Sequence, residues 1–84
     1  MPETDLAKIK AAKVIDERGI SCPEPLIVTK QALVTIPIGA ILEVRATDPT
    51  APREIPIWAR DAGQECLGVV KSNDYFRIFI RRKK

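Results

Sequence analysis

Apolar positions along the chain follow two different periods, which predict strands and helices in alternation. Short apolar runs at residues 12–18 and 41–46 contain β-branched side chains and are typical of strands. Residues 23–36 instead carry apolar side chains at steps of three and four, which is typical of a helix with one apolar face. Pro37 and Gly39 interrupt this pattern before the second strand. The chain is therefore expected to begin with a strand, a helix and a second strand.

A second helix is predicted to follow. Thr50 is suited to its N-cap, where the hydroxyl would accept a hydrogen bond from the Arg53 amide. Trp58 lies on an apolar stripe of helical spacing, so we expect it in the core, and Gly63 suits a left-handed C-terminal cap. Pro56 lies inside this stretch. The helix is therefore either kinked at Pro56, or its regular part begins there.

Residues 65–71 and 75–81 form the last two apolar runs and predict a closing β-hairpin. The second run alternates, and Phe76, Ile78 and Ile80 are expected to point inward. The predicted order is β-α-β-α-β-β. Right-handed crossovers would place both helices on one face of a mixed four-stranded sheet, which gives a two-layer α/β sandwich. The opposite face is expected to stay relatively open and to present Arg45, Tyr75, Arg77 and Arg81.

A chain of 84 residues is expected to form one domain. Residues 1–10 are polar and irregular, so they are interpreted as a flexible N-terminal lead-in to a single domain over residues 11–84. No apolar run approaches the roughly 20 residues of a membrane span, and the first residues lack the order of a signal peptide. These patterns predict a cytoplasmic protein without membrane insertion.

The positive charge of the chain is small. Fourteen Lys and Arg residues against 11 Asp and Glu residues give a net charge of +3, and four of the positive charges belong to residues 81–84. Such a tail could contact RNA or an acidic protein, but a solvated tail is the expectation. The chain also lacks the interleaved aromatic residues of a nucleic-acid stacking platform, so direct nucleic acid binding is not expected.

The two cysteines are expected to have different surroundings. A disulfide between Cys22 and Cys66 is not expected, because the cytosol keeps thiols reduced. Cys66 lies in a predicted strand and is interpreted as a core residue. The chain has no histidine, which excludes Cys–His catalysis, and it has no zinc-spaced ligand set or phosphate-binding loop. No metal or organic cofactor is expected.

Cys22 is the candidate reactive group, because it lies where the first strand gives way to the first helix. A helix that begins at Pro23 would make Cys22 its N-cap residue, and the helix dipole would favour a thiolate there. Pro25 removes an amide donor, and Glu24 adds an opposing negative charge. We therefore expect the Cys22 thiol to be exposed and its thiolate form to be modestly favoured.

Four charged residues are candidates for supporting roles. Arg18 and Lys30 flank the cysteine and could favour its thiolate or steer an anionic sulfur species, although surface solvation also accounts for both. Asp48 and Arg53 lie at the start of the second helix, where a cap and a local ion pair also account for them. Because the chain has no C-x-x-C pair, its single exposed thiol suits carrying a group rather than redox cycling.

The sequence resembles the TusA/SirA family of small sulfur-carrier proteins over about residues 12–82. The C-P-x-P pattern at the start of the first helix is the most specific part of this resemblance. The matching residues are Asp16, Arg18, Gly19, Cys22, Pro23, Glu24, Pro25, Thr29, Lys30, Ala32, Leu33, Gly39, Leu42, Asp48, Pro49, Arg53, Glu54, Ile55, Pro56, Gly63, Phe79, Ile80, Arg81 and Arg82.

The resemblance implies a carrier-type sulfurtransferase that acts with partner enzymes. Cys22 would accept a sulfane sulfur as a persulfide, Lys30 would be the basic residue near the thiol, and Asp48 and Arg53 would face partners. In that family the sulfur donors include cysteine desulfurases and rhodanese-like or DsrE-like proteins. The outlets include tRNA thiolation, molybdenum cofactor synthesis and sulfur oxidation. A regulatory or transporter-accessory thiol module in sulfur or selenium metabolism is the alternative, followed by a nucleic-acid-binding module.

Overall fold

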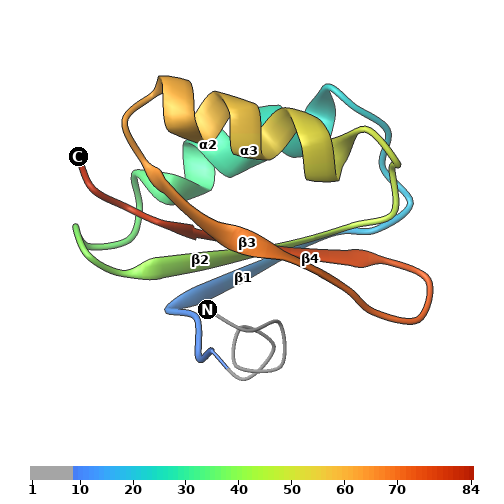
Figure 1. Ribbon diagram of the computed structural model, residues 1–84, viewed down its shortest axis with the longest axis horizontal. Helices are drawn as coiled ribbons and strands as arrows, with labels where there is room; N and C mark the ends of the chain where they lie inside the picture. Colours follow the sequence, from blue (N-terminus) through green and yellow to red (C-terminus); the bar gives the residue numbers. More distant parts are fainter. Residues whose placement is uncertain (1–8) are drawn as a thin grey trace.

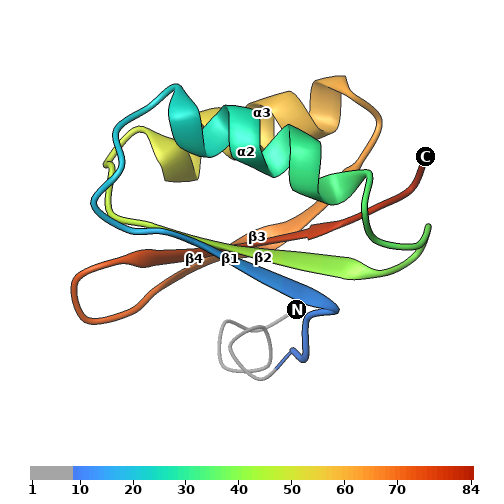
Figure 2. The same cartoon turned by 180° about the vertical axis from the view of Figure 1, so that it is seen from behind.

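The computed structural model describes residues 9–84 as a two-layer α/β sandwich. Both helices cover one face of a four-stranded sheet of order β1-β2-β4-β3 (Figures 1 and 2). The predicted fold class is therefore confirmed, while residues 1–8 of the predicted lead-in lie outside the described residues. The elements are β1 (Lys13–Glu17), α2 (Glu24–Leu33), β2 (Ile41–Ala46), α3 (Ala51–Asp61), β3 (Glu65–Lys71) and β4 (Phe76–Arg81).

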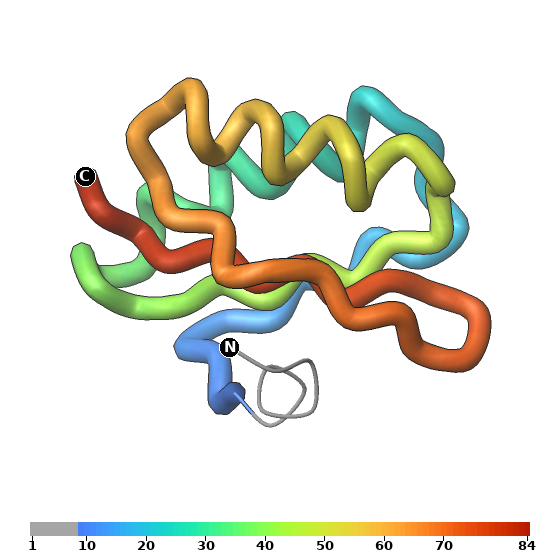
Figure 3. Tube along the Cα trace, viewed as in Figure 1, coloured from blue at the N-terminus to red at the C-terminus, as the bar shows by residue number. Residues whose placement is uncertain are grey.

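The sheet is mixed because its last strand runs against the other three. β1 pairs with β2 in parallel, and β4 pairs antiparallel with both β2 and β3. The tube in Figure 3 shows the two crossovers through the helices and the tight hairpin between β3 and β4. The carboxyl ends of β1 and β2 lie side by side as a result, and so do the loops that leave them.

The main core lies between the sheet and the helices. Leu42 and Val44 of β2 pair with Ile80 and Ile78 of β4, and all four side chains are fully buried. Each such burial stabilises the fold by about 1.5–3 kcal/mol. Phe76 was predicted to point inward with the β4 residues, but it is only half-buried at the start of the strand. Helix residues complete this core, among them Leu33, Ile55 and Ala59, with Trp58 and Cys66 packed at its edge.

The start of α3 differs from the prediction in one bond. Thr50 is the N-cap residue, but its hydroxyl donates to Asp48 Oδ1 at 2.6 Å. The Arg53 amide binds the backbone carbonyl of Thr50 instead, at 3.1 Å. The helix begins at Ala51 and includes Pro56 in its interior, so its regular part begins before that proline.

The end of α3 follows the prediction closely. Gly63 has a φ of 79°, which an L side chain rarely adopts. Its amide donates to the Arg60 carbonyl at 3.1 Å, and the Gln64 amide donates to the Ala59 carbonyl at 2.8 Å. This pair of bonds is the Schellman motif, which satisfies carbonyls that the helix leaves free.

The basic C-terminal residues are docked on the fold, contrary to the predicted solvated tail. Arg81 belongs to β4, and the Arg82 guanidinium donates to the carbonyl of Ile36 at 2.7 Å in the turn after α2. The Lys83 amide donates to the side-chain oxygen of Gln64 at 2.7 Å. Tertiary hydrogen bonds, which a charge run does not encode, therefore hold this segment.

The sheet face opposite the helices is less open than predicted. Phe79 of β4 points to this face and is fully buried. It packs with Val70 and is surrounded by partly buried apolar side chains from Ile9, Ile41 and Leu67. A second, smaller apolar cluster therefore covers part of the surface that the alternation pattern assigned to solvent.

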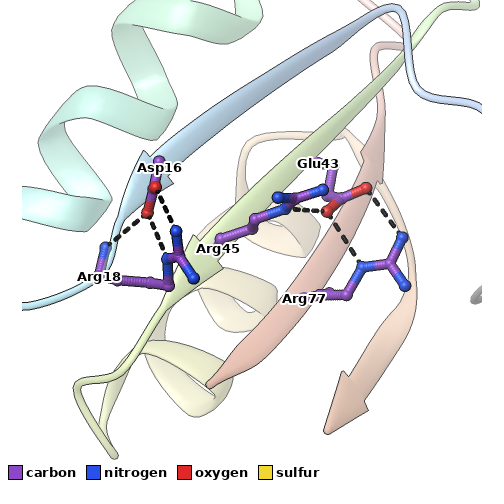
Figure 4. A network of polar contacts seen from close by, with 5 residues as sticks. All are labelled: Asp16, Arg18, Glu43, Arg45 and Arg77. Atoms are coloured by element: carbon purple, nitrogen blue, oxygen red, sulfur yellow. Dashed lines mark hydrogen bonds and ion pairs between the residues drawn. The ribbon is translucent and has the colours of Figure 1, made fainter. Parts of the chain in front are cut away.

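A buried carboxylate organises the rest of that face (Figure 4). Glu43 of β2 has a side chain only 3% exposed, and it accepts hydrogen bonds from Arg77 at 3.0 and 3.1 Å and from Arg45 at 2.7 Å. Burial by itself would raise the pKa of Glu43, but the hydrogen bonds from Arg77 and Arg45 outweigh it and lower the pKa. Two of the arginines expected on an open face, Arg45 and Arg77, are thus bound to a carboxylate of the protein itself.

Candidate functional site at Cys22

Cys22 lies in the loop that joins the carboxyl end of β1 to the start of α2. Gly19 turns the chain with a φ of 82°, and the Cys22–Pro23 peptide bond is cis. Local hydrogen bonds shape the loop: the Ile20 amide donates to Glu17, and the Glu24 amide donates to Ser21, each at 3.2 Å. The Glu24 amide therefore donates to the loop backbone, in the turn that precedes α2.

The helix begins one residue later than predicted. Pro23 is the N-cap residue, with a φ of −90° and a ψ of 7°, and α2 starts at Glu24. Cys22 therefore precedes the N-cap instead of occupying it, because the backbone at Pro23 is not helical. Pro25 lies in the first turn, where its missing amide proton leaves no helical bond unmade.

The thiol is less exposed than the sequence suggested. Cys22 is half-buried, and it packs against the main core together with Leu26. Its polar neighbours Ser21 and Glu24 are exposed. The side chain thus lies at the boundary between apolar core and solvent. There a partner can contact the thiol while core side chains restrict its position.

The loop after β2 holds the Cys22 loop through two hydrogen bonds. Asp48 Oδ2 accepts the Cys22 amide proton at 2.8 Å, and the Thr47 hydroxyl accepts the Gly19 amide proton at 2.8 Å. Asp48 Oδ1 binds the hydroxyl and the amide of Thr50 at 2.6 and 2.7 Å. Hydrogen bonds from the Thr50 hydroxyl, the Cys22 amide and the Thr50 amide, in that order, lower the pKa of Asp48.

Sequence reasoning missed the link between Asp48 and Cys22. The signal that could have found it is the parallel pairing of β1 with β2, which brings the loops at their carboxyl ends together. An Asp two residues before a helix N-cap was interpreted through that helix alone. That interpretation gave no partner to Asp48 Oδ2, which accepts the Cys22 amide proton.

Arg18 is engaged away from the thiol. Its guanidinium donates to both carboxylate oxygens of Asp16, at 2.9 and 2.8 Å (Figure 4). It also lies 5.0 Å from the centroid of the Tyr75 ring. Hydrogen bonds from the Arg18 side chain are the main cause that lowers the pKa of Asp16 to about 2. The described contacts of this guanidinium are thus with Asp16 and Tyr75, and none of them is with Cys22.

The Asp16–Arg18 pair should make the folded protein less stable as the pH falls into the acid range. The pKa of Asp16 is lower in the folded protein, so the pair stabilises the fold fully above about pH 4 and not below about pH 2. The melting temperature of the wild type should therefore exceed that of Asp16→Asn at about pH 5, and the difference should shrink as the pH falls to about 2. Arg18→Gln should show the same dependence, and a difference that does not change with pH would contradict this expectation.

Lys30 and Arg53 lie on the helices, away from the bonds that shape the Cys22 loop. The Lys30 ammonium lies 5.8 Å from the centroid of the Trp58 ring, so its contact is with α3. Arg53 pairs with its neighbour Glu54 at 3.3 Å and has a side chain 69% exposed. Such an exposed pair is worth at most about 1 kcal/mol.

Cys66 lies at the opposite end of the sheet from Cys22. It pairs with Ile80, which pairs with Leu42, which in turn pairs with Lys13 at the start of β1, whereas Cys22 follows the end of that strand. Two strands separate β3 from β1, a distance of ~14 Å, and a disulfide needs Cα atoms within roughly 7 Å. Both cysteines are free thiols, and burial raises the pKa of Cys66.

Fold and sequence comparisons identify the class of protein. Residues 13–82 match the family described as Sulfurtransferase TusA. The chain belongs to the TusA/SirA-like sulfur carrier family. The fold is similar to that of a solved structure, a SirA-like protein from Desulfitobacterium hafniense, which superposes with a TM-score of 0.75 at 23% identity. That match covers 86% of this chain and 99% of the other.

Two relatives match over nearly the whole domain. A candidate sulfur carrier protein from Archaeoglobus fulgidus is 37% identical over 71 residues, which are 84% of this chain and 97% of the relative. The sulfur carrier protein TusA of Pseudomonas putida strain GB-1 is 36% identical over 70 residues, which are 83% of this chain and 88% of the relative. Neither helix in residues 9–84 has the length and hydropathy required to cross a bilayer.

Proposed function

We propose that this protein is a sulfur carrier that holds a sulfane sulfur on Cys22 as a persulfide and relays it to an acceptor protein. The observation that carries the proposal is a half-buried free thiol, held in the loop before α2, in a chain of this family. Cys66 is less suited, because burial raises its pKa and disfavours the nucleophilic thiolate. The proposed site is therefore Cys22 alone.

The chemistry is two thiol–persulfide exchanges. The Cys22 thiolate attacks the outer sulfur of a donor persulfide; a new S–S bond forms at Cys22, and the donor cysteine leaves as a thiolate. An acceptor thiolate then attacks the outer sulfur on Cys22, and Cys22 leaves as a thiolate. Each step forms one S–S bond and breaks one, so the carrier is regenerated without an external oxidant or reductant.

Residues around Cys22 have proposed supporting roles. Pro23 and Pro25 restrict the backbone on the helix side of the thiol, and Glu24 lies exposed between them. Arg18 and Lys30 are proposed to steer an anionic sulfur species, because both have basic side chains. The partner protein would supply the remaining geometry of the transfer step.

The proposed partners are proteins that present a persulfide or a thiol. Donors of this chemistry are cysteine desulfurases and rhodanese-like or DsrE-like proteins in the cytoplasm. The exposed Arg53 at the start of α3 is proposed to face such a partner. The proposed outlets are tRNA thiolation, cofactor biosynthesis or sulfur oxidation.

Intact-mass spectrometry tests the proposal. The protein is incubated with a cysteine desulfurase and cysteine, or with a rhodanese and thiosulfate, and should gain the mass of one sulfur atom. Dithiothreitol should remove the added mass, and peptide mapping should locate it at Cys22. Protein alkylated before incubation is the control and should gain nothing. Failure of the unmodified protein to take up sulfur from both donor systems, or uptake on Cys66, would overturn the proposal.

A further inference from the structure

We infer that Asp48 is a positioning residue for sulfur transfer, which acts by holding the backbone of Cys22 from the loop after β2. This inference rests on the proposed function of Cys22. It gives Asp48 a role other than the partner contact that the family resemblance implied. The donors bound to its two carboxylate oxygens support this role.

Both oxygens of Asp48 are occupied by donors within the protein. Oδ2 accepts the Cys22 amide proton at 2.8 Å, although the two residues lie 26 positions apart. Oδ1 accepts the hydroxyl and the amide protons of Thr50, at 2.6 and 2.7 Å. A carboxylate offers about four lone-pair sites. Three of these sites already accept hydrogen bonds within the protein. The carboxylate is therefore better suited to fixing the backbone of this chain than to binding a partner's cation.

The neighbouring residue supports the same interpretation. Thr47 accepts the Gly19 amide proton through its hydroxyl at 2.8 Å. Thr47 and Asp48 thus hold both ends of the Cys22 loop, at Gly19 and at Cys22. The other backbone hydrogen bonds described for this loop join it only to β1 and α2, the elements that flank it in sequence. They run from Ile20 to Glu17, from Glu24 to Ser21 and from Ile27 to Pro23.

Holding the amide of Cys22 also restricts its sulfur. The sulfur is separated from the backbone by a single methylene group, so a backbone shift moves it directly. Exchange at sulfur requires attacking and leaving groups to be aligned, and a misplacement of about 1 Å can cost about 100-fold in rate. The bond to Asp48 is charge-assisted, which makes it stronger than a bond between neutral groups.

Kinetics with a persulfide donor protein separate positioning from partner binding. Asp48→Ala should lower kcat for sulfur uptake by about 10-fold and leave KM unchanged. Asp48→Asn retains one acceptor oxygen and should lose less. Thr50→Val removes a bond to Oδ1 but leaves the Cys22 bond, so it should stay within about 2-fold of the wild type. A partner contact would instead raise KM while kcat is maintained, and that result would overturn the inference.

Amide hydrogen exchange, measured by NMR without any donor, tests the contact directly. In the wild type, the Cys22 amide should be protected, and Asp48→Ala should accelerate its exchange by about 10-fold. The Ile78 amide in β4 should stay protected, which shows that the variant is folded, and exposed Asp61→Asn serves as the charge control. A Cys22 amide that exchanges equally in wild type and Asp48→Ala would overturn the positioning role. Absence of sulfur uptake by the wild type would overturn the proposed function instead, so the two failures are distinguishable.

Discussion

Replacing Cys22 with serine is expected to reduce sulfur relay to the level of a reaction without carrier. A hydroxyl is a weak nucleophile at neutral pH and cannot form the S–S bond that stores the sulfur. The measurement follows labelled sulfur from a desulfurase, through the carrier, to an acceptor thiol. Because Cys22 is half-buried and serine is close to it in size, the variant should keep its fold.

Cys66→Ser is the matched control for this prediction. The structure places Cys66 against the main core at the far end of the sheet, so its loss should leave the relay rate unchanged. A small decrease in stability is expected, because a hydroxyl replaces a partly buried thiol. Relay that survives in Cys22→Ser and disappears in Cys66→Ser would contradict the assignment of the site.

Glu43→Ala is expected to lower the free energy of unfolding by about 3 kcal/mol. The variant removes the carboxylate that both Arg45 and Arg77 bind, and it leaves two guanidinium groups close together without their common partner. Arg77 has a side chain only 18% exposed, so water cannot fully replace the lost bonds. Total stabilities of small domains are about 5–15 kcal/mol, which makes this a large fraction. Urea unfolding measures it.

An exposed glutamate provides the matched control. Glu54 pairs with Arg53 at the surface, so Glu54→Ala should cost less than about 1 kcal/mol. Glu43→Gln should fall between the two alanine variants, since the amide keeps one acceptor oxygen and the shape of the side chain. Equal losses in Glu43→Ala and Glu54→Ala would show that the buried network adds nothing to stability.

Most of the fold could be predicted from the local pattern of apolar and polar residues. Helical and strand periods placed all six elements, and the class of fold is confirmed. Element ends were harder, because they depend on single backbone angles. The first helix was expected to begin at Pro23 and to extend to residue 36, but it spans Glu24–Leu33. Gly63 was placed correctly because a left-handed cap has a local signal, namely a glycine after the last apolar residue of the stripe.

The buried side chains on the sheet face opposite the helices have no local sequence signal of this kind. Phe79 and Glu43 alternate with core residues, so their pattern is that of a solvent-facing row. Their burial arises because β2 and β4 pair in a register that sets them side by side, with Arg77 and Ile41 as neighbours. Arg82 is similar: its partner, the Ile36 carbonyl, is distant in sequence and adjacent only in the folded chain.

Local chemistry along the chain was sufficient to single out Cys22, because two prolines, a helix start and the absence of histidine are properties of neighbouring residues or of composition. How the thiol is held was decided by the folded chain, since Asp48 reaches the Cys22 amide only when β1 and β2 pair in parallel. The partial burial of Cys22 has the same origin, because it depends on core side chains from other elements. Periodicity describes short-range order, whereas contacts between distant residues depend on the register of strands and on which loops meet.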